Sequence, residues 1–134
     1  MQFADDIKLL RVTLDSTLSF NKHIVTVTLS SHYHICAQCH ICPLLTLDAA
    51  KAMAVSIVGS RLDYCNSILY CMLQVNIDRL QCVQSVLAQV VAEAPCTISS
   101  TNIRRDLHWL PVNHRITYKL CIITRNTLHT TQPL

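Results

Sequence analysis

The chain of 134 residues contains a single glycine, Gly59, and four prolines. Tight turns between β-strands rely on residues that adopt a positive φ or carry a fixed φ, chiefly glycine and proline. With so few of these residues, a β-rich fold with many hairpins is disfavoured. We therefore predict a mainly α-helical chain, and its length fits one domain.

Hydrophobic periodicity and helix-breaking residues predict about five helices after a short N-terminal strand or hairpin. Residues 7–14 have the apolar character of a strand, which can continue past a turn into residues 17–20. Ser19 or Asn21 can cap the first helix, and Gly59 is expected to break the second. The helices are expected over residues 22–42, 46–59, 61–70, 77–93 and 111–128, with a short additional helix ending at Trp109.

The helix predicted from residue 77 has the clearest apolar stripe. Its apolar residues recur at three- and four-residue steps, as on one face of an α-helix: Ile77, Leu80, Val83, Leu87, Val90 and Val91. The same spacing places four polar residues largely on the solvent side: Asp78, Arg79, Gln81 and Gln84. An alternative function follows from this stripe, that of a small helical interaction module that binds a protein or a second copy of the chain.

Hydrophobic residues make up 51% of the chain and charged residues 14%, with a formal net charge of +3. So apolar a chain is unusual for a free-standing soluble domain and suggests a surface that packs against something else. A charge of +3 permits a nucleic-acid partner without demonstrating one.

No apolar run reaches the roughly 18 residues of a membrane span. The acidic N-terminus also lacks the basic and apolar regions of a signal peptide. We therefore expect no membrane partner and an intracellular location, nuclear or cytoplasmic. That compartment is reducing, so the eight cysteines are not predicted to form disulfides.

Five short motifs follow one another along the chain. They are Leu10-Arg11-Val12-Thr13-Leu14-Asp15, Leu62-Asp63-Tyr64-Cys65-Asn66-Ser67, Arg79-Leu80-Gln81-Cys82-Val83-Gln84, Leu107-His108-Trp109-Leu110-Pro111-Val112 and Arg115-Ile116-Thr117-Tyr118-Lys119. In order and spacing, the chain resembles the post-palm, thumb-like segment of the reverse transcriptase of LINE-type non-LTR retrotransposons. In that family a Leu-Gly-Val-x-Leu-Asp strand precedes a helical thumb. The resemblance covers essentially the whole chain.

The resemblance implies a palm-end strand or hairpin remnant over residues 1–20 and a helical thumb-like domain over residues 21–134. It implies a role in holding an RNA or DNA template–primer through its backbone, as part of an RNA-directed DNA polymerase. The palm and fingers of the parent enzyme, with the Mg²⁺ ions that its chemistry needs, would lie outside this chain. The chain alone is then expected to have no polymerase activity and no cofactor.

The chain departs from the family pattern at several positions. Arg11 stands where the family has glycine. Cysteine or glutamine stands where relatives tend to carry arginine, at Cys36, Cys39, Cys42, Cys82, Cys96, Gln38 and Gln89. Arginine codons that begin with CG become cysteine or glutamine codons when a methylated cytosine deaminates. We hypothesise that the chain derives from a decayed, non-functional copy of an element.

Asp5 and Asp6 end a Phe-Ala-Asp-Asp sequence that imitates the box in which reverse transcriptases hold two Mg²⁺ ions. A working site needs a third carboxylate from another strand. In the family, this box lies far upstream of the Leu-Gly-Val-x-Leu-Asp strand, whereas here the two almost touch. Short motifs often match by chance, so we predict no catalytic residue in this chain.

Four possible zinc ligands, His32, Cys36, Cys39 and His40, share one stripe of the first predicted helix. Thiolate and imidazole groups suit zinc. However, four ligands on one straight helix cannot easily surround an ion tetrahedrally, and no second Cys/His pair with zinc-finger spacing follows. We expect an ordinary helix face here, and a Cys/His zinc-binding domain is the alternative.

Basic residues gather towards the C-terminus, where Arg115 and Lys119 are i, i+4 neighbours that would project together. Cations on a helix can contact backbone phosphates without reading bases, although plain solvation explains such a face equally well. The predicted nucleic-acid-binding residues are Arg104, Arg105, Arg115 and Lys119. Trp109 is expected to pack in the core and not to stack on a base.

Overall fold

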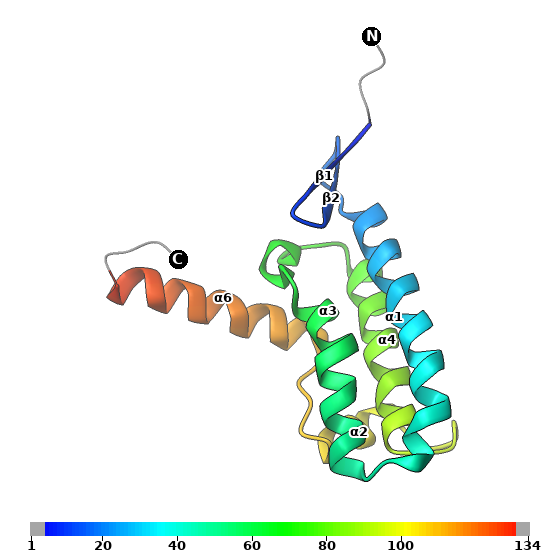
Figure 1. The fold of residues 1–134 in the computed structure, drawn as a ribbon. Coiled ribbons are helices and arrows are strands. Elements are labelled where there is room, and N and C mark those ends of the chain that lie inside the picture. Colours follow the sequence, from blue (N-terminus) through cyan, green and yellow to red (C-terminus); the bar gives the residue numbers. More distant parts are fainter. Residues whose placement is uncertain (1–4, 131–134) are drawn as a thin grey trace.

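The structure is a computed structural model that describes residues 5–130 (Figure 1). A β-hairpin precedes a set of helices, as predicted, so the mainly α fold class is confirmed. The elements are β1 (Asp6–Leu9), β2 (Val12–Asp15), α1 (Asn21–Ile41), the 3-10 helix η1 (Cys42–Leu44), α2 (Leu47–Ala54), the π-helix η2 (Val55–Gly59), α3 (Ser60–Asp63), the 3-10 helix η3 (Asn66–Leu69), α4 (Gln74–Val91), α5 (Ser100–Asp106) and α6 (Val112–His129).

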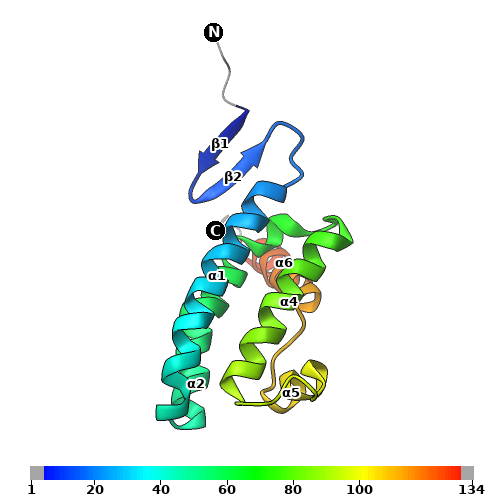
Figure 2. The ribbon, with the colours of Figure 1, turned by 90° about the vertical axis from the view of Figure 1, so that its right-hand side faces the viewer.

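Three rods lie side by side as a helical bundle: α1, α4, and the continuous run of α2, η2 and α3 (Figures 1 and 2). α5 lies at one end of the bundle against α4, whereas α6 projects away from it to the side (Figure 1). Aliphatic side chains from all three rods fill the core, among them Ile24, Ile35, Val58, Leu80 and Leu87.

The apolar stripe of α4 explains why this helix is the centre of the bundle. Ile77, Leu80, Val83, Leu87 and Val91 are buried and Val90 is half-buried, as their spacing predicts. Because this stripe lies in the core, it is not available as the docking surface of an interaction module. The prediction for Gln84 is wrong: this side chain is 1% exposed, because its amide is hydrogen-bonded inside the fold.

The second helix begins where expected, since the Thr46 hydroxyl accepts a hydrogen bond from the Ala49 amide at 3.3 Å. The break predicted at Gly59 does not occur. Gly59 ends the π-helical turn η2 with a helical φ of −56°, and the chain continues directly into α3. A glycine inside a helix costs only about 1 kcal/mol relative to alanine, which the packing of this buried turn outweighs.

The helix predicted over residues 61–70 is interrupted after Asp63. Tyr64 is extended and Cys65 is left-handed, with a φ of 53°, before the short η3 begins. Tertiary contacts outweigh helix propensity here. The Tyr64 hydroxyl donates to the Leu10 carbonyl of the hairpin at 2.8 Å, and Asp63 pairs with Arg115 of α6.

The N-terminal hairpin turns over two residues, Leu10 and Arg11, because Leu9 pairs with Val12 across the strands. Both turn residues have positive φ, 48° and 66°, as in the type I′ turns that favour Asn and Gly. Residues 7–14 are therefore two strands and not one, and no strand continues over residues 17–20. Scarcity of glycine does not mean scarcity of turns, since residues other than glycine adopt positive φ at Leu10, Arg11, Leu18, Phe20, Cys65, Cys71, Glu93 and His108.

The start of α1 is held by the loop before it. The Asp15 carboxylate accepts hydrogen bonds from the hydroxyls of Thr17 and Ser19 and from the Phe20 amide. The Ser19 and Thr17 hydroxyls lower the pKa of Asp15 to about 2. Ser19 accepts a hydrogen bond from the Asn21 amide at 3.4 Å, but neither Ser19 nor Asn21 is the N-cap of α1, since that position is Phe20 in a left-handed conformation.

Candidate nucleic-acid interface

Arg115, predicted to contact phosphates, instead makes an ion pair within the chain. Its Nε donates to Asp63 Oδ1 at 2.8 Å, and its Nη2 contacts Asp63 Oδ2. This two-point pairing joins α3 to α6 and is the strongest geometry an arginine and a carboxylate can adopt. Its charge is therefore already paired with Asp63, and contact of Arg115 with a phosphate stays a prediction.

Arg104 is also not a surface cation. It is buried on α5, where its guanidinium bonds to the Ser100 carbonyl and the Thr101 hydroxyl. Burial lowers the pKa of Arg104, as expected for a cation removed from water. This guanidinium is held by its own helix with little surface open to a phosphate, and its predicted phosphate contact stays a prediction.

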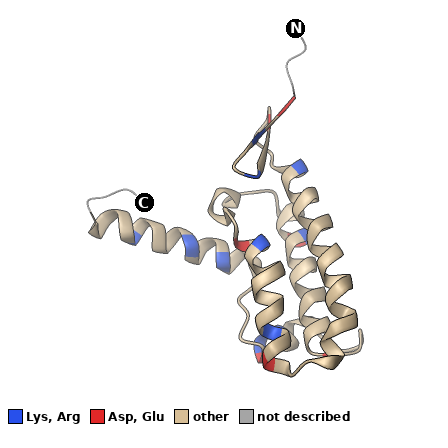
Figure 3. Ribbon diagram, in the orientation of Figure 1, with Lys and Arg blue, Asp and Glu red and all other residues tan. Residues whose placement is uncertain are grey.

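Arg105 and Lys119 are exposed, but they stand on different helices. α5 lies at the end of the bundle and α6 projects from its side, so the basic residues of the two helices are separated (Figure 3). The four predicted residues therefore do not form one binding surface.

The Leu-His-Trp-Leu-Pro-Val motif is the connection between α5 and α6. His108 is left-handed, and the amides of His108 and Trp109 bond back to Arg105 and Arg104 at 3.0 and 2.8 Å, which is a Schellman cap. Trp109 is half-buried against the core, as predicted.

Two glutamines of α4 hold the end of this connection in place. Gln84 Nε2 donates to the Leu110 carbonyl at 2.8 Å, and Gln81 Oε1 accepts from the Val112 amide at 3.0 Å. Gln81 Nε2 also donates to Gln84 Oε1 at 2.9 Å. The Arg-Leu-Gln-x-Val-Gln motif therefore positions the start of α6.

Asp5 is exposed and Asp6 begins β1, where its Oδ2 pairs with Lys22 Nζ at 2.5 Å. Phe3 and Ala4 of the same motif lie outside the described residues. The four possible zinc ligands lie along α1, with Cys36, Cys39 and His40 exposed and His32 half-buried. Within residues 5–130, no three His, Cys, Asp or Glu side chains are grouped so that they could hold a metal ion.

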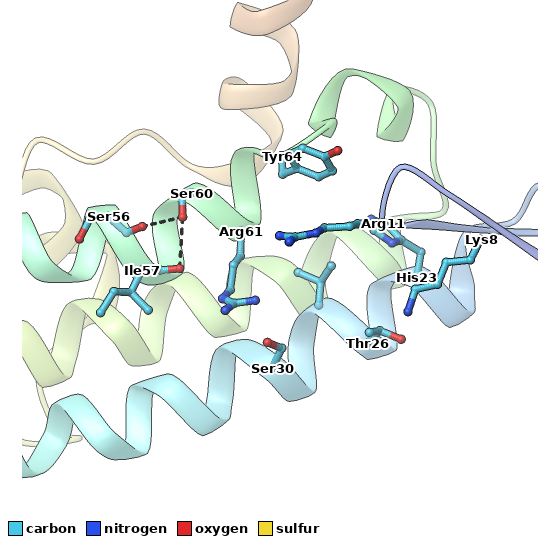
Figure 4. Close-up of a pocket in the computed structure, with 11 residues that line it drawn as sticks. Lys8, Arg11, His23, Thr26, Ser30, Ser56, Ile57, Ser60, Arg61 and Tyr64 are labelled. Carbon is cyan, nitrogen blue, oxygen red and sulfur yellow. Dashed lines mark hydrogen bonds between the residues drawn. The ribbon is translucent and has the colours of Figure 1, made fainter.

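A different set of cations does converge. A groove of about 710 Å³ lies between the hairpin, α1 and the η2–α3 segment (Figure 4). Three basic side chains line it: Lys8 from β1, Arg11 from the hairpin turn and Arg61 from α3. The remaining lining residues are neutral or hydroxyl-bearing and include no carboxylate: His23, Thr26, Val27, Ser30, Ser56, Ile57, Ser60 and Tyr64.

The tip of the hairpin is fixed over this groove by the bond from the Tyr64 hydroxyl to the Leu10 carbonyl. Arg11 follows directly, and its side chain extends along the groove towards Arg61 (Figure 4). Arg61 Nη2 lies 3.0 Å from His34 Nε2, and among the described residues Arg61 forms no salt bridge with a carboxylate.

Three hydroxyls of the groove donate within their own helical segments, and that of Tyr64 donates to the hairpin. Thr26 donates to the Lys22 carbonyl, Ser56 to that of Met53, and Ser60 to that of Ser56. His23, at 5% exposure, contributes no positive charge, because burial lowers its pKa. The groove can therefore attract an anion chiefly through Lys8, Arg11 and Arg61.

Sequence reasoning missed this site because Arg61 lies far along the chain from Lys8 and Arg11 and shares no pattern with them. Leu10, which precedes Arg11, meets the Tyr64 hydroxyl only through a tertiary hydrogen bond. Lys8 and Arg11 belong to the segment predicted as a strand or hairpin remnant, and Arg61 directly precedes the motif that begins at Leu62.

Comparison with known proteins adds no relative. No protein-family model matches the chain, and no curated protein or solved structure matches it significantly.

Across residues 5–130, no helix combines the length and the apolar character needed to cross a membrane. All eight cysteines are free, and six of them are exposed: Cys36, Cys39, Cys71, Cys82, Cys96 and Cys121.

Proposed function

We propose that this chain is the thumb-like portion of a LINE-type non-LTR retrotransposon reverse transcriptase and holds the template–primer through its phosphate backbone. In this proposal, the palm and fingers of the parent polymerase, with their Mg²⁺ ions, perform the RNA-directed DNA synthesis. The chain itself contributes affinity and position, and no polymerase chemistry.

The observation that carries the proposal is the groove lined by Lys8, Arg11 and Arg61 without any carboxylate. Three unpaired cations around one concave surface focus a positive potential there, which attracts polyanions irrespective of sequence. Backbone phosphates are the ligand class that such a site suits best.

The five motifs that suggested the resemblance support the proposal in a second way. They contact one another in pairs. Leu10 of the first motif bonds to Tyr64 of the second, and Asp63 pairs with Arg115. The glutamines of the α4 motif bond to the Leu-His-Trp-Leu-Pro-Val motif that leads into α6. Motifs with these roles preserve a scaffold and not a catalytic centre. Asp6 of the Phe-Ala-Asp-Asp sequence is likewise bound to Lys22 and not to a second carboxylate.

Binding of a fluorescein-labelled template–primer by the full chain tests the proposal. We expect measurable affinity at low salt, and no primer extension when nucleotides and Mg²⁺ are supplied. Arg61→Gln should lower the affinity several-fold, because it removes a cation that contacts a phosphate. Arg79→Gln is the matched control, since Arg79 is exposed on α4 and does not line the groove. Nucleotide incorporation by the chain, or equal losses of affinity in both variants, would contradict the proposal.

We further propose that the chain comes from a decayed copy of the element. The replaced glycine supports this, because Arg11 occupies a left-handed turn position that favours glycine. Exposed cysteines at supposed arginine positions support it too, since free cysteine is usually buried. The coding DNA tests the idea: each such cysteine codon should lie one transition from an arginine codon found in sibling copies.

A further inference from the structure

We infer that the groove lined by Lys8, Arg11 and Arg61 binds a single-stranded segment of nucleic acid, with one base stacked on Tyr64. The inference rests on the proposed function and narrows it, since a thumb that holds a duplex would use an open surface. Here the cations surround a bounded groove, and an aromatic ring stands beside them (Figure 4).

The size of the groove favours a single strand. Its volume of about 710 Å³ lies in the range of pockets that enclose small ligands, about 300–1,000 Å³. A nucleotide or two of a single strand can enter such a space between the hairpin and the helices, whereas a duplex would present only one of its two backbones to it. The hairpin, α1 and the η2–α3 segment form the walls, so the strand would contact all three.

Tyr64 has the properties of a stacking platform. Its side chain is 47% exposed at the groove, and the bond from its hydroxyl to the Leu10 carbonyl fixes the ring. A ring held in place loses little conformational entropy when a base stacks on it. Positive grooves combined with aromatic rings are the usual means of binding single strands without sequence preference.

The cations are placed to bind the phosphates on either side of that base. Arg11 points along the groove between Tyr64 and Arg61, and Lys8 follows on the hairpin (Figure 4). Because the hydroxyls of Thr26, Ser56 and Ser60 donate to their own helices, few neutral donors are left to read base edges. The site should therefore accept any sequence.

The test compares the affinity of the full chain for labelled oligothymidylate and for a DNA duplex of the same length. We expect the single strand to bind more tightly, and unlabelled duplex to compete poorly. Tyr64→Leu should weaken single-strand binding by about fivefold or more, as loss of a stacking ring does. Tyr64→Phe keeps the ring but loses the hydroxyl that bonds to Leu10, so its affinity should fall less than that of Tyr64→Leu. Tyr70→Leu, at a tyrosine outside the groove that is 58% exposed, should change nothing.

A second readout does not depend on how well Tyr64→Leu folds. A single strand that carries 2-aminopurine should lose fluorescence on binding to the natural chain, because stacking quenches this base. Equal affinity for strand and duplex, together with unchanged 2-aminopurine fluorescence, would overturn the inference and leave the proposed function standing. Absence of salt-sensitive binding to either nucleic acid would overturn both.

Discussion

At the residue scale, Arg11 affects both the backbone conformation of the hairpin turn and the positive charge of the groove. Its φ of 66° costs an L-residue roughly 1 kcal/mol or more, yet its guanidinium is one of three cations that line the site. Glycine, which the family pattern has at this position, would favour the stability of the turn, whereas arginine favours the attraction of phosphates.

Arg11→Gly should separate these demands. We expect the free energy of unfolding to rise by up to about 1 kcal/mol, because glycine adopts the left-handed turn without strain. Affinity for nucleic acid should fall at the same time, because the groove then has one cation fewer. Chemical denaturation and fluorescence anisotropy measure the two effects. A variant that loses stability and keeps its affinity would show that both assignments are wrong.

The buried imidazole of His23 should make the free energy of unfolding depend on pH. Burial lowers its pKa below the ordinary value of 6.5, so the unfolded chain takes up a proton at a pH where the folded chain does not. The contribution of His23 to stability is therefore complete above about pH 6.5 and declines as the pH falls below that value. Denaturation midpoints measured from about pH 7.5 to about pH 5 should fall less steeply in His23→Leu than in the natural chain. Parallel pH profiles would rule out this role.

At the element scale, much of the helical pattern follows from sequence. The apolar stripe of α4 and the cap at Thr46 were predictable because each depends on residues close together in the chain. The positions of Gln84 and Arg115 share one cause. Each side chain is held by a contact with a distant segment, which local spacing does not reveal.

A substitution at Gly59 tests whether α2, η2 and α3 form one continuous helical run. A Cβ added at this position would lie 3.7 Å from its nearest neighbours, Ala54 O and Val55 Cγ1, which is ordinary van der Waals contact. Gly59→Ala should therefore stabilise the chain by about 0.5–1 kcal/mol, because alanine favours helical geometry. Thermal or urea denaturation measures this change. A loss of stability would indicate that the chain bends at Gly59 instead of continuing as a helix.

The link between α3 and α6 can be measured with a double-mutant cycle of Asp63→Asn and Arg115→Gln. The side chains of Arg115 and Asp63 are 21% and 44% exposed, so solvent screens their attraction. We expect a coupling energy of about 1 kcal/mol, above that of an open surface pair because two guanidinium nitrogens are engaged. Additive effects of the two substitutions would mean that the pair does not hold α6.

At the scale of the whole molecule, the apolar surface fits a part that works inside a larger assembly. Large hydrophobic side chains are exposed on the hairpin and on the projecting α6, among them Ile7, Leu9, Leu10, Tyr118 and Leu128. No residue described after Ile116 in α6 is buried. These faces suit the palm and fingers of the proposed parent enzyme, in keeping with the apolar composition of the chain.

The cationic groove, proposed above as the binding site, is the part of the molecule that the sequence predicts least well. The sequence predicts a basic surface where cations cluster along the chain, yet Arg104 and Arg115 are engaged within the fold. The residues that converge come from the hairpin and α3 instead. Their convergence depends on a hairpin tip held by Tyr64, which no local pattern encodes.

Salt dependence tests the central claim that the groove of Lys8, Arg11 and Arg61 binds phosphates. The natural chain and the triple variant Lys8→Gln, Arg11→Asn, Arg61→Gln would be titrated with single-stranded DNA between about 50 and 200 mM salt. Asparagine is chosen at position 11 because it tolerates the left-handed turn.

We predict that the logarithm of the binding constant falls linearly with the logarithm of salt concentration for the natural chain. The slope should be shallower by about 2 in the triple variant, because each phosphate that a cation neutralises on a single strand contributes about 0.7 to the slope. Identical slopes in the two proteins, or binding by the natural chain that is insensitive to salt, would contradict the account.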